Sequence, residues 1–145
     1  MNLYRQQKNR QQEQINSFLS AHAFFAFDKG QYEKGLEKLG LTEADAGRLV
    51  PITGGGYLLQ EYADELKGLL QSFRQERQDA INDQETGKQF AVDMFTAALN
   101  DYEYSYTGDT GEALEALGYT PAEIDSSPVL KDALAIAKHK AGGTE

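Results

Sequence analysis

The residues best suited to chemistry lie between positions 101 and 112, where acidic residues alternate with tyrosines. Carboxylates accept hydrogen bonds and charge from Arg and Lys, and Tyr joins apolar area to a polar tip, which favours it at protein interfaces. The segment therefore predicts a surface that binds a basic protein partner. Its partner-binding residues are predicted to be Asp101, Tyr102, Glu103, Tyr104, Tyr106, Asp109 and Glu112.

The same segment has two other interpretations. Alternation from Tyr102 to Tyr106 is typical of a strand with tyrosines facing inward and polar residues outward, and such a strand could still bind through its outward acids. The oxygen-bearing residues also follow part of the spacing of a calcium loop that starts at Asp101. That loop needs Gly at its sixth position, where the chain has Tyr106, so no metal is expected.

The rest of the composition excludes several catalytic classes. The chain has no Cys and two His, at positions 22 and 139, which leaves little for thiolate zinc sites, Cys nucleophiles or His relays. The Gly54–Gly56 run lacks the Lys and Ser or Thr of a phosphate-binding loop. We expect no enzyme and no cofactor. A carboxylate-based, metal-dependent hydrolase remains as an alternative.

The net charge of −9 is concentrated in one segment. Residues Asp83–Asp125 hold ten acidic residues and one basic residue, Lys88, so the net charge of this segment equals that of the whole chain. Such a field disfavours direct binding of nucleic acid and favours a basic protein surface, such as that of a nucleic-acid-binding protein. Ordinary solubility explains the same acidity equally well, so both interpretations stay open.

The length of 145 residues suits one domain over 1–145, with residues 1–14 as a frayed or projecting end of the first helix. No apolar run approaches a membrane span, and the basic, Gln-rich beginning is unlike a secretory signal. We therefore expect a cytoplasmic protein without a membrane partner.

Hydrophobic spacing predicts an α+β fold that is mostly helical, with a small antiparallel sheet. Apolar residues at spacings of three and four predict long helices over 2–21 and 60–82. Strands are expected over Ala23–Phe27 and Tyr102–Tyr106, and a hairpin is expected around Gly54–Gly56. A self-associating structural or assembly protein, joined through the long helix 60–82, is therefore a second functional class.

A short repeat suggests two similar strand–helix units. The stretch Leu36–Ala44 matches Leu114–Ala122 at six positions that hold Leu, Glu, Leu, Gly, Thr and Ala. Each copy follows an expected aromatic strand, so both strands could lie in one sheet. Alternatively, the shared pattern is a common way to end one helix and begin the next.

Several short motifs together carry a resemblance that extends from Phe24 to about Ala137. They are Phe24-Phe25-Ala26-Phe27, the Gly54–Gly56 run, Asp93-Met94-Phe95, Tyr102-Glu103-Tyr104 and Ala116-Leu117-Gly118-Tyr119-Thr120. The chain resembles an uncharacterised family of small acidic proteins encoded by phages and other mobile elements of gut and Gram-positive bacteria. The resemblance implies an accessory protein, such as an inhibitor of a nucleic-acid-binding host defence protein of the anti-CRISPR or anti-restriction type.

Overall fold

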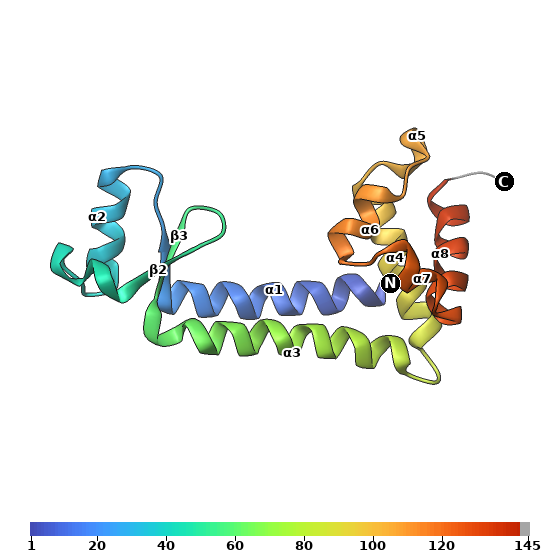
Figure 1. The fold of residues 1–145 in the computed structure, drawn as a ribbon, viewed down its shortest axis with the longest axis horizontal. Coiled ribbons are helices and arrows are strands. Elements are labelled where there is room, and N and C mark those ends of the chain that lie inside the picture. The colour runs from blue at the N-terminus through green and yellow to red at the C-terminus, as the bar shows by residue number, and fades with distance from the viewer. Residues whose placement is uncertain (143–145) are drawn as a thin grey trace. The chain divides into compact units, whose positions relative to one another are not determined.

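Helix-forming stretches dominate the chain, and three short strands make its one sheet (Figure 1). The computed structural model describes residues 1–142. Its elements are α1 (Leu3–His22), β1 (Ala23–Phe25), α2 (Lys29–Lys38), the 3-10 helix η1 (Glu43–Arg48), β2 (Leu49–Ile52), β3 (Gly56–Leu59), the 3-10 helix η2 (Gln60–Tyr62), α3 (Ala63–Asn82), α4 (Gly87–Asp101), α5 (Tyr104–Thr107), α6 (Gly111–Leu117), α7 (Pro121–Asp125) and α8 (Pro128–Ala141). The predicted class, mostly helical α+β with a small antiparallel sheet, is confirmed.

Contacts within the chain divide it into two compact units. Unit 1 comprises Met1–Asn9 and the chain from Glu76 onward, and unit 2 comprises Arg10–Gln75. Helices α1 and α3 each contribute residues to both units. The single domain over 1–145 and the frayed or projecting end over 1–14 stay predictions. Among the described residues, no helix combines the length and apolar character that crossing a membrane requires.

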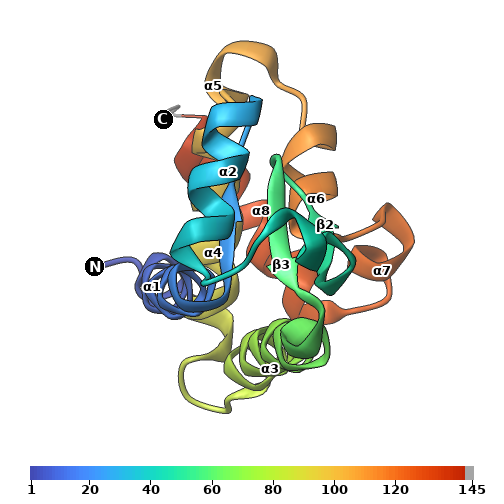
Figure 2. The ribbon, with the colours of Figure 1, turned by 90° about the vertical axis from the view of Figure 1, so that its left-hand side faces the viewer.

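The sheet of unit 2 has the strand order β1-β3-β2, and both pairs of strands are antiparallel. Figure 2 shows α2 lying along β1. The rings of Phe24 and Tyr57, which are paired across β1 and β3, stack with their centroids 5.4 Å apart, and Tyr32 of α2 meets both edge-on. A Cβ on Gly35 would lie only 2.0 Å from the Phe24 ring, so α2 reaches β1 through a residue without a side chain.

The predicted hairpin around Gly54–Gly56 is confirmed as β2 and β3. Gly54 and Gly55 have φ values of +87° and +83°, which an L-residue rarely adopts, so glycine is needed in this turn. The expected strand over Ala23–Phe27 is confirmed as the shorter strand β1.

Unit 1 is built around α4, which is buried along most of its length. Its residues Met94 and Phe95 have no exposed surface, and Ala133 and Ala137 of α8 are equally buried. Small residues on α8 let the two helices approach closely, and α6 packs against α4 as well (Figure 1).

A buried carboxylate joins the beginning of the chain to α4. Asp93 is only 9% exposed, and its two carboxylate oxygens accept hydrogen bonds from the Leu3 backbone N–H at 2.8 Å and the Gln89 amide at 2.7 Å. Tyr4 is 6% exposed and meets Phe90 edge-on. The first turn of α1 is thus held by α4 through these contacts and through the Arg5 guanidinium, which donates to the Ala97 carbonyl at 3.4 Å.

The sequence repeat forms the same backbone motif twice. In the first copy the N–H groups of Leu41 and Gly40 donate to the carbonyls of Leu36 and Glu37, which is the Schellman pattern at a helix end. In the second copy the corresponding donors are Tyr119 and Gly118, and the acceptors are Leu114 and Glu115.

In each copy a capping box then starts the next helix, at Thr42 with Asp45 and at Thr120 with Glu123. Of the two interpretations, the common helix-end and helix-start pattern is therefore the one that the structure shows. The first copy lies in unit 2 and the second in unit 1.

The predicted strand over Tyr102–Tyr106 is wrong, and so is a second strand–helix unit in the sheet. Helix α4 continues to Asp101, where the Tyr102 N–H still donates to the carbonyl of Ala98, and Tyr104–Thr107 forms one helical turn. All three strands of the described chain pair within unit 2, so no strand is available to pair with the tyrosines. The alternation also does not create a buried face, because Tyr106 is 88% exposed.

The repeated glycines provide a test of the helix ends. Gly40 and Gly118 have φ values of +72° and +85°, so Gly40→Ala and Gly118→Ala should each lower the free energy of unfolding by about 1 kcal/mol. Gly68 lies inside α3 with open space around its Cα, so Gly68→Ala should raise it by about 0.5–1 kcal/mol. Urea unfolding followed by circular dichroism measures the free energy of unfolding of all three variants. A Gly118→Ala variant more stable than the wild type would contradict the need for glycine at this helix end.

The link between α3 and α4 predicts a pH dependence. Hydrogen bonds from the Thr86 and Glu85 backbone N–H groups lower the pKa of Asp83 from its ordinary value of 3.8. Because the folded-state pKa lies below the unfolded one, the stabilisation is present above the unfolded pKa and is lost as pH falls through the folded pKa. The wild type and Asp83→Asn should therefore differ in urea midpoint at about pH 6, and this difference should shrink as the pH is lowered to about 2.5. A difference that stays constant over this range would contradict the role of the carboxylate.

Candidate functional site: the acidic aromatic segment

The segment from Asp101 to Glu112 connects α4 to α6 through a single helical turn, α5 (Figure 1). Two left-handed residues, Glu103 and Gly108, stand before and after this turn. The Gly108 N–H donates to the Tyr104 carbonyl at 2.8 Å, which closes the turn. These two left-handed residues therefore bracket the helical turn that carries Tyr104 and Tyr106.

Glu103 is the only residue other than glycine with a positive φ among residues 1–142, at +57°. An L-residue in this region carries a strain of about 1–2 kcal/mol, because its Cβ approaches its own backbone. Its N–H donates to the Asn100 carbonyl, and its own carbonyl accepts from Tyr106 and Thr107. Such backbone strain is more frequent at functional sites than elsewhere, so Glu103 is a candidate functional residue.

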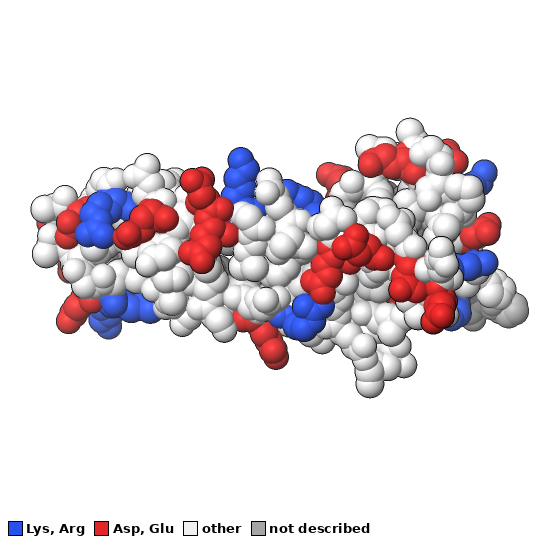
Figure 3. All heavy atoms as spheres, turned by 90° about the horizontal axis from the view of Figure 1, so that it is seen from below, with Lys and Arg blue, Asp and Glu red and all other residues white. Residues whose placement is uncertain are grey.

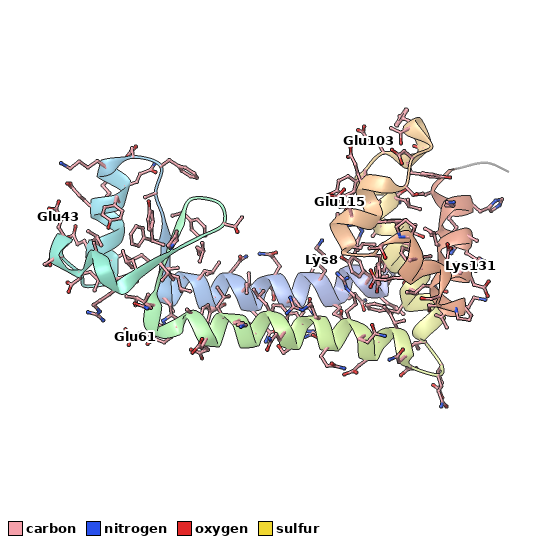
Figure 4. The ribbon with its side chains drawn as sticks, viewed as in Figure 1. Lys8, Glu43, Glu61, Glu103, Glu115 and Lys131 are labelled. Atoms are coloured by element: carbon pink, nitrogen blue, oxygen red, sulfur yellow. The ribbon has the colours of Figure 1, made fainter. Side chains whose placement is uncertain are left out.

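Four residues line a small hollow between the end of α4 and α6, with a volume of about 380 Å³: Tyr102, Glu112, Glu115 and Ala116. We call it the acidic hollow. Tyr102 is 41% exposed, so part of its ring faces the solvent. Glu112 and Glu115 lie three residues apart on α6, which places them on one face of the helix. Figure 4 shows Glu115 on α6 and Glu103 next to α5.

The predicted site residues divide into two groups. Tyr102 and Glu112 line the acidic hollow, and Tyr106 is 88% exposed on the α5 turn. The carboxylate of Asp101 instead accepts from Arg5 of α1 at 3.0 Å, which partly neutralises it. Tyr104 packs partly buried against the core of unit 1.

Asp109 has a local structural contact. Its carboxylate accepts from the Gly111 N–H at 2.8 Å, at the start of α6, while Thr107 Oγ1 accepts from the Asp109 N–H. Asp109 therefore shapes the turn that leads into α6, and its charge lies next to the positive end of that helix.

Sequence reasoning missed Glu115 and Ala116 as members of the hollow. The spacing was visible in the sequence, because Glu112 and Glu115 are three residues apart, which is about one turn of α6. The missing information was that α4 ends beside α6, which only the tertiary packing shows.

Acidic side chains dominate the segment and its hollow. Among residues 1–142, no group of three or more His, Cys, Asp or Glu side chains is arranged to hold a metal ion. Figure 3 shows several groups of acidic side chains on one face of the molecule, with Lys and Arg side chains between them. The hollow itself is lined by two acids, one tyrosine and one alanine, without a basic residue.

Residues 3–140 match the model of a family of unknown function, DUF7659, and the chain belongs to this family. No curated protein and no solved structure matches the chain. The resemblance to an uncharacterised family is thereby confirmed, whereas an origin in phages and mobile elements stays a prediction.

The strain at Glu103 predicts a gain from glycine. Glu103→Gly should raise the free energy of unfolding by about 0.5–1 kcal/mol, because glycine adopts positive φ without the Cβ contact. Glu103→Gln removes the charge and keeps the backbone, so it should stay within about 0.5 kcal/mol of the wild type. Paired urea titrations measure both variants. A Glu103→Gly variant less stable than Glu103→Gln would show that the left-handed backbone is not strained.

Proposed function

We propose that the chain is a non-enzymatic binding protein that holds a basic side chain of a partner protein in its acidic hollow. The observation that carries this proposal is the juxtaposition of an exposed Tyr102 ring with the Glu112 and Glu115 carboxylates in one hollow of about 380 Å³. The hollow is large enough for the end of one Arg or Lys side chain.

The chemistry of the hollow favours a cation. A guanidinium or ammonium group above a tyrosine ring gains a cation–π attraction, worth about 0.5–1 kcal/mol at exposed sites. Carboxylates accept charge-assisted hydrogen bonds from the same group, and Arg can donate to a carboxylate through two parallel bonds. An Arg side chain in this hollow could therefore gain both the cation–π attraction of the ring and hydrogen bonds to the two carboxylates.

The surroundings of the hollow extend the interface. Tyr106 is 88% exposed on the α5 turn, and burying such a ring against a partner would remove much apolar surface from water. Glu103 and Asp109 add negative charge to the same loop. These charges steer a basic partner toward the surface and oppose nucleic acid, whose phosphates they repel.

The partner class follows from this charge pattern. Basic, Arg-rich surfaces are typical of proteins that bind nucleic acid, and an acidic protein can occupy such a surface in place of the phosphates. The predicted origin in a mobile element supports one form of this function, an inhibitor of a host defence protein of the anti-CRISPR or anti-restriction type. Such a partner would be met in the cytoplasm.

A labelled basic peptide tests the proposal. Fluorescence anisotropy would follow a fluorescein-labelled peptide of alternating Arg and Gly, titrated with the full chain at low salt. We expect Tyr102→Ala and the double variant Glu112→Gln/Glu115→Gln each to weaken binding by about tenfold, because each removes one part of the hollow.

A matched control separates recognition from net charge. The double variant Glu33→Gln/Glu37→Gln removes two exposed carboxylates from α2 of unit 2 and leaves the hollow intact. It should change affinity by less than about twofold. Equal loss of affinity in both double variants would mean that the peptide senses only the overall charge, and the proposal would fail.

A further inference from the structure

The outer edge of β1 carries backbone groups that face away from the sheet. The Ala26 N–H donates to the Gly55 carbonyl, and hydrogen-bonded pairs alternate along an antiparallel ladder, so Phe24 also bonds to its partner Tyr57. The residues between them, Ala23 and Phe25, therefore direct their N–H and C=O groups outward. Because the strand order is β1-β3-β2, β1 has no further strand beside it.

The opposite edge of the sheet is blocked. By the same alternation, β3 bonds to β2 through Val50 and Ile52, so Pro51 is directed outward. Proline has no N–H, and an outward proline prevents another strand from pairing at that edge. The sheet can therefore accept a strand only beside β1.

Two side chains of α2 already form hydrogen bonds with outward backbone groups along the β1 edge. The Lys38 ammonium donates to the Ala23 carbonyl at 3.2 Å, and Gln31 Oε1 accepts from the Phe27 N–H at 2.7 Å. Between these two contacts, the outward N–H and C=O of Phe25 have no partner among the described residues. Lys38 and Gln31 thus stand where a neighbouring strand would supply its donors and acceptors.

This edge opens into a groove of unit 2 with a volume of about 820 Å³. One wall is a face of α1, with Gln12, Asn16 and Leu19, and the other wall is a face of α2, with Gln31, Lys34 and Lys38. The spacings of three, four and seven residues in each wall are those of one helical face.

The charged side chains that line the groove are both basic. Lys34 and Lys38 are the only charged residues that line it, in a chain of net charge −9. Within residues 1–142, Lys34 has no ion pair, and Lys38 bonds to a carbonyl and not to a carboxylate. Phe25, which is 47% exposed, adds apolar surface at the same edge.

We propose that this groove binds an extended acidic segment of a partner protein, which adds as a strand to the outer edge of β1. The backbone of the segment pairs with Phe25, and its carboxylates meet Lys34 and Lys38. Strand addition draws affinity from backbone bonds, while the flanking side chains select the sequence. This site is separate from the acidic hollow, since it lies in unit 2 and selects the opposite charge.

Peptides of defined chemistry test the site on the full chain. The probe is a fluorescein-labelled ten-residue peptide of alternating Val and Glu, followed by fluorescence anisotropy. We expect saturable binding, and we expect Lys34→Glu and Lys38→Glu each to weaken it by about tenfold or more. The same peptide with Lys in place of Glu should not bind the groove.

Lys67→Glu is the matched control. Lys67 is an exposed lysine of α3 in unit 2 that does not line the groove, so its reversal changes net charge equally. It should change affinity by less than about twofold. Circular dichroism checks that all three variants keep the helical content of the wild type.

Two further measurements distinguish strand addition from simple charge attraction. An N-methylated version of the Val–Glu peptide cannot donate backbone hydrogen bonds and should not bind. Hydrogen exchange measured by NMR should slow at the Phe25 amide when the peptide binds, whereas the Phe24 amide, already bonded to β3, should change little. Equal binding of the N-methylated peptide, or unaltered affinity in Lys34→Glu and Lys38→Glu, would overturn the proposal. Absence of binding would show that Lys38 and Gln31 only protect the edge.

Discussion

The buried carboxylate of Asp93 is the contact on which the arrangement of unit 1 depends. It lies on the most buried helix of the chain and accepts the backbone N–H at the start of α1, far away in the sequence. A charge taken out of water in this way is tolerated only when hydrogen bonds satisfy it, and Leu3 and Gln89 supply them. The same helix α1 then continues to His22, directly before β1.

Two hollows of this acidic chain are lined by charged side chains of opposite sign. In unit 1, Tyr102 lines a hollow together with the two glutamates of α6, and Tyr106 is exposed on the neighbouring α5 turn. In unit 2 the helices α1 and α2 border the open edge of β1 with two lysines. The net charge alone suggests a uniform acidic coat. Its distribution over the fold gives each unit its own electrostatic character.

Elements with strong local signals could be predicted from the sequence, and those decided by distant packing could not. The Gly54–Gly56 turn and the paired glycine–threonine helix junctions follow from preferences within a few residues. The tyrosine alternation did not predict a strand correctly, because a strand needs a partner and the only sheet among residues 1–142 lies in unit 2. Tyr102 and Glu112 were expected in the site from the local sequence, but Glu115 was not. Glu115 joins Tyr102 in one hollow only because α4 ends beside α6, which depends on distant packing.

The proline in β2 has a consequence for assembly. A sheet with two open edges can join copy to copy without limit, which is how edge-to-edge aggregation begins. Here the missing N–H of Pro51 closes one edge, so a chain that meets another through its sheet has only the β1 edge to use. Two such edges can pair with each other, but the pair then presents a proline on both sides and cannot grow. A single imino acid thus makes any sheet-mediated contact of this protein self-terminating.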